Sequence, residues 1–261
     1  MLAALLNVVA RIPLVGATLR WYAHRYAEDS VVGIRSGYMQ GVKWRRHHRY
    51  VNGYWLGHYE LAIQGALVRE LKAGSVFFDV GANAGFFTLL AATRVGPLGK
   101  CVAFDPDRDN MESIQEQCSL NELSWVLVVN EAVSDSVGYA WLERSHAGAP
   151  TAHIRDHRGA SECIRVPTTS LDAAAKKYGA PSLVKIDIEG AEDRALRGAT
   201  NLLRHDRPKF VIELHSRETA EGIRALLLNS GYELRSLTRE PLVDRTLPSH
   251  ILALPTAKVS M

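Results

Sequence analysis

Acidic side chains recur along this chain directly after short apolar segments that are typical of buried β-strands. They are Asp79, Asp105, Glu131, Asp187, Glu189 and Glu213, and His215 follows the last of them. In an open α/β sheet, the carboxyl ends of neighbouring strands meet at one edge, where ligands bind. Carboxylates gathered at such an edge repel one another unless a ligand, a metal or hydrogen bonds compensate. The pattern therefore predicts a binding site at this edge.

The first of these acids precedes a glycine turn at residues 81–85. Its two glycines let the backbone turn sharply and let a ligand approach, and a helix beginning near residue 85 would point free N–H groups at that ligand. A dinucleotide-binding turn reads G-x-G-x-x-G, but here an asparagine stands at the second glycine position and the preceding acid would repel a pyrophosphate. We therefore expect the cationic nucleoside S-adenosylmethionine, with an ordinary βα turn as the alternative. The predicted cofactor contacts in this turn are Asp79, Gly81, Ala82, Asn83 and Gly85.

The next two segments add groups that suit the same nucleoside. Asp105 lies 24 residues after the first glycine of the turn, where an acid can bind ribose hydroxyls, and Pro106 ends the strand there. The alternative role for this acid is a cap of the following helix. Asn130 and Glu131 offer polar atoms to the adenine edge, and the small Ala132 leaves room for its ring.

The last two acidic strand ends are the predicted catalytic residues. Alternation places Asp187 and Glu189 on the same side of the strand end, where a carboxylate can hold the amine of the cofactor or deprotonate a hydroxyl acceptor. Glu213 and His215 repeat this spacing, and the unperturbed pKa of an imidazole is near neutrality, as a general base requires. As an alternative, Asp187, Glu213 and His215 could ligate one divalent cation. A single histidine among acids is more often hydrogen-bonded, so the sequence favours a site without metal.

Regular alternation of predicted strands and helices places these residues. The central pattern predicts a parallel, doubly wound sheet with helices on both faces, and the last two strands have no helix between them, so one must run antiparallel. Residues 139–143 form an extra strand, and residues 144–164 lack periodicity and are expected to be a loop or insertion. The predicted strands are 75–80, 100–105, 125–130, 182–188, 209–215, 232–237 and 251–254, and the predicted helices are 59–73, 85–95, 107–120, 172–178, 190–204 and 217–229.

The charge distribution separates an N-terminal extension, residues 1–53, from a catalytic domain, residues 54–261. The chain of 261 residues has the composition of a soluble globular protein, with 47% hydrophobic and 23% charged residues. Its first 50 residues carry eight Lys and Arg against two acids, a net charge of +6, whereas the whole chain has +3. The densest basic cluster, Trp44–Tyr50, could contact an anionic substrate, RNA phosphates or lipid headgroups, and a solvated surface is the favoured alternative.

The first 27 residues are apolar but interrupted by charges, so neither a membrane-spanning helix nor a secretory signal is expected. They could form an amphipathic helix that lies on a membrane or packs on the domain. Three scattered cysteines without a C-x-x-C pair indicate a reducing compartment, so we expect a cytoplasmic protein, with peripheral membrane contact through residues 1–27 as an open alternative.

Five blocks of this sequence together resemble the FkbM family of S-adenosylmethionine-dependent methyltransferases. The resemblance covers about residues 54–254, and one departure is the aspartate at 105, where the family more often has glutamate. The blocks are F-D-V-G-A-N-A-G (78–85), F-D-P (104–106), N-E-A-V-S-D (130–135), K-I-D-I-E-G-A-E (185–192) and E-L-H (213–215).

The resemblance implies a class I methyltransferase fold: a Rossmann-like, seven-stranded, mostly parallel sheet of order 3-2-1-4-5-7-6 with one antiparallel strand, here with an N-terminal helical extension. It also implies O-methylation of a hydroxyl on a sugar, glycolipid or natural product, with acceptor choice residing in the N-terminal arm and residues 144–164. The alternatives are an RNA or protein methyltransferase, and a membrane-docking protein that keeps the fold. Oligomeric state stays open, and nucleic acid is not the favoured partner.

Overall fold

A computed structural model of the chain describes residues 26–50, 53–144, 152–157, 163–239 and 248–256. The chain forms two compact units, Met1–Leu61 and Ala62–Met261. The predicted N-terminal helix lies outside the described residues except for its last two positions. Among the helices of the described ranges, none is both long enough and apolar enough to cross a membrane.

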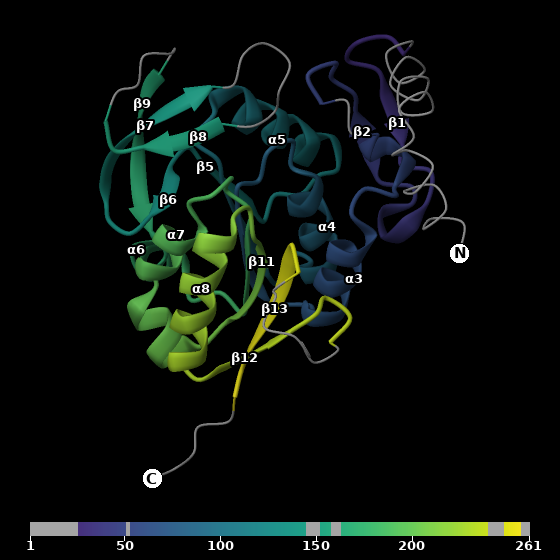
Figure 1. Cartoon of the computed structure of the whole chain (residues 1–261). Helices are drawn as coiled ribbons and strands as arrows, with labels where there is room; N and C mark the ends of the chain where they lie inside the picture. Colours follow the sequence, from purple (N-terminus) through teal and green to yellow (C-terminus); the bar gives the residue numbers. More distant parts are fainter. Residues whose placement is uncertain (1–25, 51–52, 145–151, 158–162, 240–247, 257–261) are drawn as a thin grey trace. The chain divides into compact units, whose positions relative to one another are not determined.

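The larger unit is built on a seven-stranded central sheet, shown in Figure 1. Its strand order is β12-β13-β11-β10-β3-β4-β5, and β13 runs antiparallel to both of its neighbours while the other pairs are parallel. This mostly parallel sheet has the order that the resemblance implied. The strands are β3 (Val76–Val80), β4 (Lys100–Phe104), β5 (Val126–Val129), β10 (Leu183–Ile186), β11 (Lys209–Glu213), β12 (Tyr232–Arg235) and β13 (His250–Pro255).

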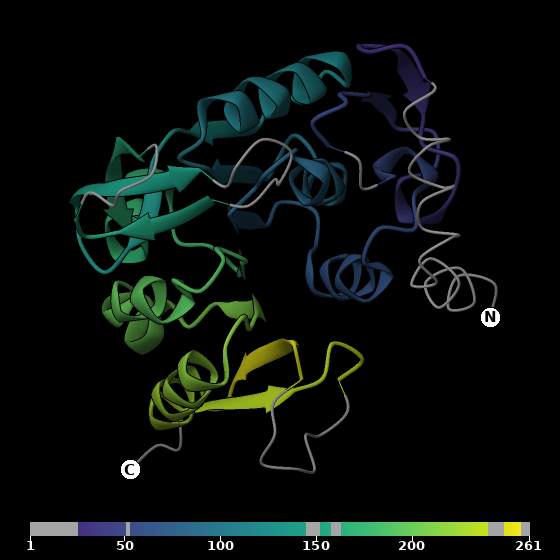
Figure 2. The same ribbon diagram turned by 45° about the horizontal axis from the view of Figure 1, so that its top comes forward.

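Helices cover both faces of this sheet, so its strands are apolar on both sides (Figures 1 and 2). Phe78 and Val80 of β3 pack in a core with Ile223 and Leu227 of α8, whereas Phe77 and Asp79 face the opposite layer. One layer contains α3 (Leu61–Glu70), α4 (Phe86–Val95) and α5 (Arg108–Leu120). The other contains α6 (Leu171–Tyr178), α7 (Glu192–Arg197), the π-helical turn η3 (Leu202–Asp206) and α8 (Arg217–Asn229).

A second sheet of four strands, ordered β6-β9-β7-β8, was only partly predicted. Part of the expected loop at residues 144–164 is β8 and the start of β9, so that expectation was wrong for these residues. The four residues of β8, A-H-I-R, do alternate apolar and polar side chains, but this run is too short to mark a strand until its pairing with β7 is considered. The strands are β6 (Ala132–Ser134), β7 (Gly138–Arg144), β8 (Ala152–Arg155) and β9 (Cys163–Ser170).

The described part of the smaller unit is a short hairpin with two 3-10 turns, not a helix. Strands β1 (Val31–Gly33) and β2 (Lys43–Arg45) pair antiparallel. The turns are η1 (Gly37–Met39) and η2 (Tyr54–Leu56). Buried aromatic side chains, among them Trp44 and Trp55, form most of its interior. The division of the chain at residue 53 stays a prediction.

Candidate active site

The Asp105 carboxylate ties the turn after β3 to the end of β4. Its Oδ2 accepts a hydrogen bond from the Asn83 amide at 2.8 Å, and its Oδ1 accepts from the Asp107 amide at 2.9 Å and from Asn110 Nδ2 at 3.0 Å. Asp105 is 5% exposed, and burial raises the pKa of its carboxyl group to about 6. An ionised carboxylate has about four acceptor positions, of which these contacts use three. Asp105 therefore keeps room for one further donor.

Packing within the protein explains why both glycines of the turn are needed. Gly81 has a φ of +79°, and a Cβ there would lie 1.9 Å from the Asp187 carbonyl oxygen. Gly85 has a φ of +87°, and its Cβ would lie 3.1 Å from Ile114 Cγ1. A side chain at either position would therefore meet neighbouring residues of the chain. Contact of these glycines with a cofactor stays a prediction.

The amide groups at the start of this turn also bond within the protein. The amides of Gly81 and Ala82 donate to the Phe104 carbonyl at 3.0 and 3.1 Å, and the Gly85 amide donates to the Ala82 carbonyl. These three amides are therefore bonded within the protein, and the free N–H groups expected at the start of the helix stay a prediction. The turn instead offers an acceptor: Asn83 Oδ1 is buried, and no described group hydrogen-bonds to it. Asn83 holds this position with a φ of +49°, in the left-handed region that asparagine tolerates.

The three residues expected to contact adenine follow β5 but do not lie together: one side chain lies beside Asp105 and another lies in the core of the second sheet. Asn130 Nδ2 donates to the Asp105 carbonyl at 3.0 Å, so this side chain lies beside the carboxylate turn, where Pro106 also lies. Glu131 is partly buried. Ala132 begins β6, is 1% exposed and packs in the apolar core of the second sheet. Its side chain lies among Leu142 and Val166, and room for an adenine ring beside Ala132 stays a prediction.

A buried lysine that sequence reasoning missed connects the first and fourth strand ends. Lys185 is the register partner of Asp79 in the parallel pairing of β10 with β3. Its Nζ lies 3.6 Å from Asp79 Oδ1 and 3.2 Å from Asp187 Oδ2, and 5.2 Å from the centre of the Phe87 ring. A charged residue inside the otherwise apolar run of residues 183–186 was the available signal.

Asp79 is therefore held inside the protein rather than displayed at the site. It is 0% exposed, and its Oδ2 accepts a hydrogen bond from Thr88 Oγ1 at 2.6 Å. Burial raises the pKa of this carboxyl group, while the neighbouring Lys185 opposes the shift. Lys185 also donates to the Gly81 carbonyl at 3.4 Å, and contact of Asp79 with a cofactor stays a prediction.

The four predicted catalytic residues converge at the ends of β10 and β11. His215 Nε2 lies 3.4 Å from Glu189 Oε2, 3.7 Å from Asp187 Oδ1 and 3.8 Å from Glu213 Oε1. Neighbouring parallel strands bring these groups together although 28 residues separate Asp187 from His215. The spacing of Asp187, Glu213 and His215 would also admit one cation, since their ligand atoms lie within 4.8 Å of one another.

A fifth residue, Glu192, was missed by sequence reasoning and dominates the chemistry of His215. Glu192 is 0% exposed, and its Oε1 lies 2.8 Å from His215 Nδ1. This hydrogen bond, with the charges of Glu192, Glu189 and Glu213, raises the pKa of His215 to about 9. The imidazole is thus protonated at neutral pH, which corrects the expectation of a near-neutral base.

Glu192 also shapes the turn that carries Glu189. Its Oε1 accepts hydrogen bonds from the amides of Ile188 at 3.3 Å and Gly190 at 3.0 Å. Glu189 and Gly190 both have positive φ, +54° and +101°. A non-glycine residue in this region is uncommon, so the side chain at the start of α7 holds a strained turn in place.

The acceptors at these strand ends suit the expected nucleoside. Asn83 Oδ1 and the remaining position on Asp105 can receive ribose hydroxyls, and the carboxylates around His215 can receive a cationic amine. A Cβ added at Gly190 would have no neighbouring atom within 4 Å, so the space beside this glycine is open. The donor set of a sulfonium nucleoside with hydroxyl and ammonium groups therefore matches the acceptors that this chain presents.

Comparison with known proteins identifies the family. Residues 79–234, more than half of the chain, match the model of the methyltransferase FkbM domain. The hexuronic acid methyltransferase AglP of Haloferax volcanii is 27% identical over 179 residues, which cover 67% of this chain and 71% of that protein.

Solved methyltransferase structures are also similar. The methyltransferase FkbM of Methylobacillus flagellatus KT has 16% identity and a TM-score of 0.46, over 94% of this chain and 60% of that chain. The S-adenosylmethionine-dependent O-methyltransferase of Thermotoga maritima has 12% identity and a TM-score of 0.47, over 77% and 66% of the two chains. On the strength of the domain match, this chain belongs to the FkbM family of methyltransferases.

Proposed function

We propose that this S-adenosylmethionine-dependent methyltransferase methylates a hydroxyl oxygen of a sugar-type acceptor. The observation that carries the proposal is the cluster of carboxylates around His215 at the ends of β10 and β11. Such a cluster suits a reaction in which a neutral hydroxyl loses a proton beside a cationic donor. The sugar acceptor is supported by the relative named for hexuronic acid, and a glycolipid or natural product with a similar hydroxyl belongs to the same class.

Residues of the first four strand ends would hold the cofactor. Asn83 and Asp105 would bind the ribose hydroxyls, Asn130 and Glu131 the adenine edge, and Asp187 the amine. When bound, S-adenosylmethionine supplies a methyl group on a sulfonium, which is a good leaving group. The protein then mainly aligns the acceptor oxygen with that carbon and receives the proton.

A carboxylate, rather than His215, would receive the acceptor proton. His215 is already protonated at neutral pH, so it has no free nitrogen lone pair for a hydroxyl proton. Asp187 and Glu189 both lie near its Nε2, at 3.7 and 3.4 Å, and a carboxylate oxygen can accept a proton. One of these carboxylates would take up the proton that the acceptor hydroxyl loses on methylation, and His215 would stabilise their arrangement.

A labelled-methyl assay on the full chain tests this proposal. Hexuronic acids, neutral sugars, glycolipids, RNA and protein would each be offered, with and without a chelator. We expect transfer to a sugar hydroxyl that the chelator leaves unchanged, and Glu189→Gln should slow transfer more than it weakens donor binding. Transfer only to RNA or protein, or no transfer to any sugar-bearing pool, would refute the acceptor class. Loss of transfer with chelator would refute the metal-free site.

A further inference from the structure

Strand β7 carries apolar side chains on both faces, although its outer face is exposed. Ala140 and Leu142 point into the core of the second sheet and are 4% and 1% exposed, whereas Tyr139 on the outer face is 65% exposed. Trp141 shares the outer face by alternation and is partly exposed. A sheet with one solvated face normally carries polar side chains there. Two neighbouring aromatic rings therefore mark this face as an interaction surface.

The strands on either side of β7 add arginines to the same face, and Figure 1 shows the three strands side by side. Opposed residues of antiparallel strands point to one face, and Trp141 is opposed by Arg155 of β8 and by Arg165 of β9. Both arginines are exposed, and the exposed Pro167 lies opposite Tyr139. We call these five residues, Tyr139, Trp141, Arg155, Arg165 and Pro167, the aromatic platform.

The two arginines of the platform differ in the charge that they offer to a ligand. Arg155 forms an ion pair with Glu143 of β7. Arg165 stacks on Tyr139 instead, with its guanidinium carbon 3.9 Å from the centre of the ring, and no carboxylate of the described ranges pairs with it. A stacked guanidinium keeps the N–H groups in its plane for an acceptor, and their planar geometry matches a carboxylate. The platform therefore favours an anionic group at Arg165.

A sugar chain fits this platform better than a protein or a nucleic acid does. A standard protein interface uses about 20–30 residues on each side, many more than the platform has. Nucleic-acid binding depends on several phosphate contacts, whereas only one of the two platform arginines is not in an ion pair. Tyrosine and tryptophan rings combine apolar faces with a polar tip, which suits the C–H faces and hydroxyl edges of a pyranose.

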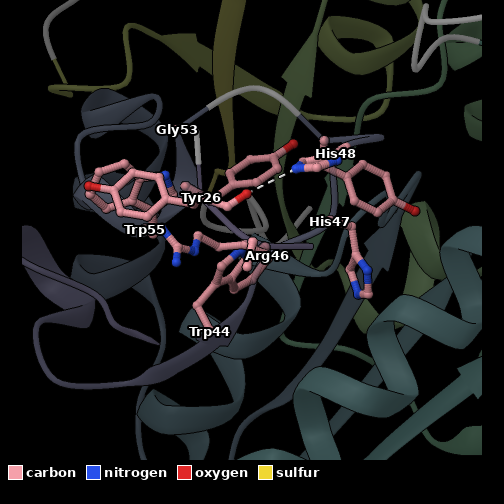
Figure 3. Close-up of a pocket in the computed structure, with 10 residues that line it drawn as sticks. Tyr26, Trp44, Arg46, His47, His48, Gly53 and Trp55 are labelled. Carbon is pink, nitrogen blue, oxygen red and sulfur yellow. Dashed lines mark hydrogen bonds between the residues drawn. The ribbon is translucent and has the colours of Figure 1, made fainter. Parts of the chain in front are cut away.

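Aromatic rings and an arginine also meet in the N-terminal unit, where Trp44, Trp55 and Arg46 line a small pocket shown in Figure 3. Its cavity of about 30 Å³ has room for about one water molecule. Arg46 already donates to Ser30 Oγ from Nε and Nη2, at 3.0 and 2.6 Å. That cluster therefore belongs to the interior of its unit, whereas the platform is open to a sugar ring.

The platform belongs to the same compact unit as the candidate active site. Arg194 of α7 ties the second sheet to that site, because its Nη1 lies 2.7 Å from Asp156 after β8 and its Nε lies 3.6 Å from Asp135 before β7. Glu192, the buried carboxylate of the acid cluster, lies two residues before Arg194 on the same helix. A sugar chain on the platform would thus be held by the unit that carries the acid cluster.

We propose that the aromatic platform binds a carboxylated sugar chain, with pyranose rings against Tyr139 and Trp141 and a carboxylate at Arg165. This inference rests on the proposed sugar acceptor for its ligand class, and it adds a surface that holds the chain while one of its sugars is methylated. Attachment at a second place raises the effective concentration of the acceptor at the reacting site. The platform therefore lowers the KM of a long acceptor and leaves that of a single sugar unchanged.

Binding to the full chain without methyl donor tests the platform separately from catalysis. Calorimetry would compare an oligogalacturonate, its uncharged methyl ester and a uridine oligonucleotide. We expect the oligogalacturonate to bind best and added salt to weaken it. Tyr139→Ala should weaken its binding about 3–10-fold. Arg165→Gln should weaken it about 2–5-fold and leave the binding of the methyl ester unchanged.

Matched variants separate loss of the surface from loss of folding. Tyr38→Ala removes a tyrosine that is 55% exposed in the N-terminal unit, and Arg204→Gln removes an exposed arginine of η3, so each should change affinity by less than about twofold. Arg165→Lys keeps the charge but loses the planar fork, and should restore only part of the binding. Because Tyr139 is exposed, Tyr139→Ala should unfold at nearly the same urea concentration as the unaltered protein.

The binding outcomes decide between the platform and its rivals. Losses in Tyr38→Ala as large as those in Tyr139→Ala, or a methyl ester that binds as tightly as the oligogalacturonate, would overturn the platform. Tighter binding of the uridine oligonucleotide that Tyr139→Ala abolishes would assign the surface to nucleic acid instead. A dimer in sedimentation that Tyr139→Ala dissociates would assign it to a second copy of the chain. Either result would overturn the sugar chain as the ligand.

Methyl transfer then separates this inference from the proposed function. With donor present, Tyr139→Ala should raise the KM of the oligogalacturonate without changing kcat, while galacturonate itself keeps its KM. Transfer to the sugar chain with a KM that Tyr139→Ala leaves unchanged would overturn the platform while the function stands. Tyr139-dependent binding of the oligogalacturonate without transfer to any sugar would support the platform and refute the acceptor class.

Discussion

His215 Nδ1 lies 2.8 Å from Oε1 of the fully buried Glu192, at the centre of the carboxylate cluster. This contact raises the pKa of His215 to about 9, because the charged imidazolium is hydrogen-bonded to Glu192 while three further carboxylates lie near Nε2. It also links α7 to the end of β11, so the same hydrogen bond raises the pKa of His215 and fixes the position of its ring.

Glu192→Gln should lower the pKa of His215 from about 9 towards 6.5, because the Glu192 hydrogen bond is the largest cause of the shift. Titration of the imidazole C–H signals by NMR measures this directly. Glu213→Gln is the control, since its Oε1 is 3.8 Å away and its removal should shift the pKa less. An unchanged pKa in Glu192→Gln would contradict the assignment.

The same pair should make folding stability depend on pH. The folded pKa of His215 lies above its unfolded value of 6.5, so this stabilisation is full below pH 6.5 and is lost as the pH rises through about 9. Urea unfolding of Glu192→Gln should therefore show a flatter stability curve over this range than the unaltered protein. If the unfolding free energies of the two proteins changed equally with pH, the hydrogen bond between Glu192 and His215 would not be the cause.

Lys185→Met should destabilise the protein by about 3–5 kcal/mol, because it leaves Asp79 buried without its cationic neighbour. Adding Asp79→Asn should recover part of this loss, since the uncharged amide is cheaper to bury. Chemical denaturation provides the measurement. Lys176→Met is the matched control at an exposed position of α6, and it should stay within about 0.5 kcal/mol of the unaltered protein. If the free-energy losses of Lys185→Met and Asp79→Asn simply added in the double variant, the two side chains would not stabilise each other.

Donor binding should weaken as the pH falls below about 6. Protonation of Asp105, whose pKa is raised to about 6 by burial, removes the acceptor proposed for a ribose hydroxyl. Calorimetry at pH 7.5 and 5.0 should show a loss of roughly 10-fold that Asp105→Asn abolishes by binding weakly at both values. Asp109→Asn, at an exposed position of α5, should retain the response. Tight binding by Asp105→Asn would show that the carboxylate is not a contact.

Glu70 should contribute acid sensitivity to the larger unit. Although burial opposes the shift, hydrogen bonds from Arg239 and Lys209 lower its pKa to about 2. The folded pKa lies below the unfolded value, so the stabilisation is full above about pH 4.5 and is lost as the pH falls towards 2. Glu70→Gln should cost about 2 kcal/mol at pH 7 and flatten the acid limb of the unfolding curve. If Glu70→Gln lost stability in acid as steeply as the unaltered protein does, Glu70 would not be the source of this sensitivity.

Elements with a strong local pattern were predictable. The run from Val76 to Val80 and the turn before Phe86 carry β-formers and then glycines, and β3 and α4 appear as expected. The acid at Asp105 could be placed beside the turn because the ends of parallel strands meet at one edge. Strand β8 was missed because its four residues give only a short apolar and polar alternation, and its pairing with β7 completes the strand.

By itself the sequence determined the mostly parallel fold, the family and the acids at the strand ends, because strand and turn propensities are local and the family blocks lie in linear order. Only the tertiary structure decided how those acids are used. It buries Asp79 against Lys185, fills the space beside Gly81 with a carbonyl, and gives His215 the partner Glu192. These outcomes depend on burial and on register between strands distant in sequence, which set pKa and access and which no single segment encodes.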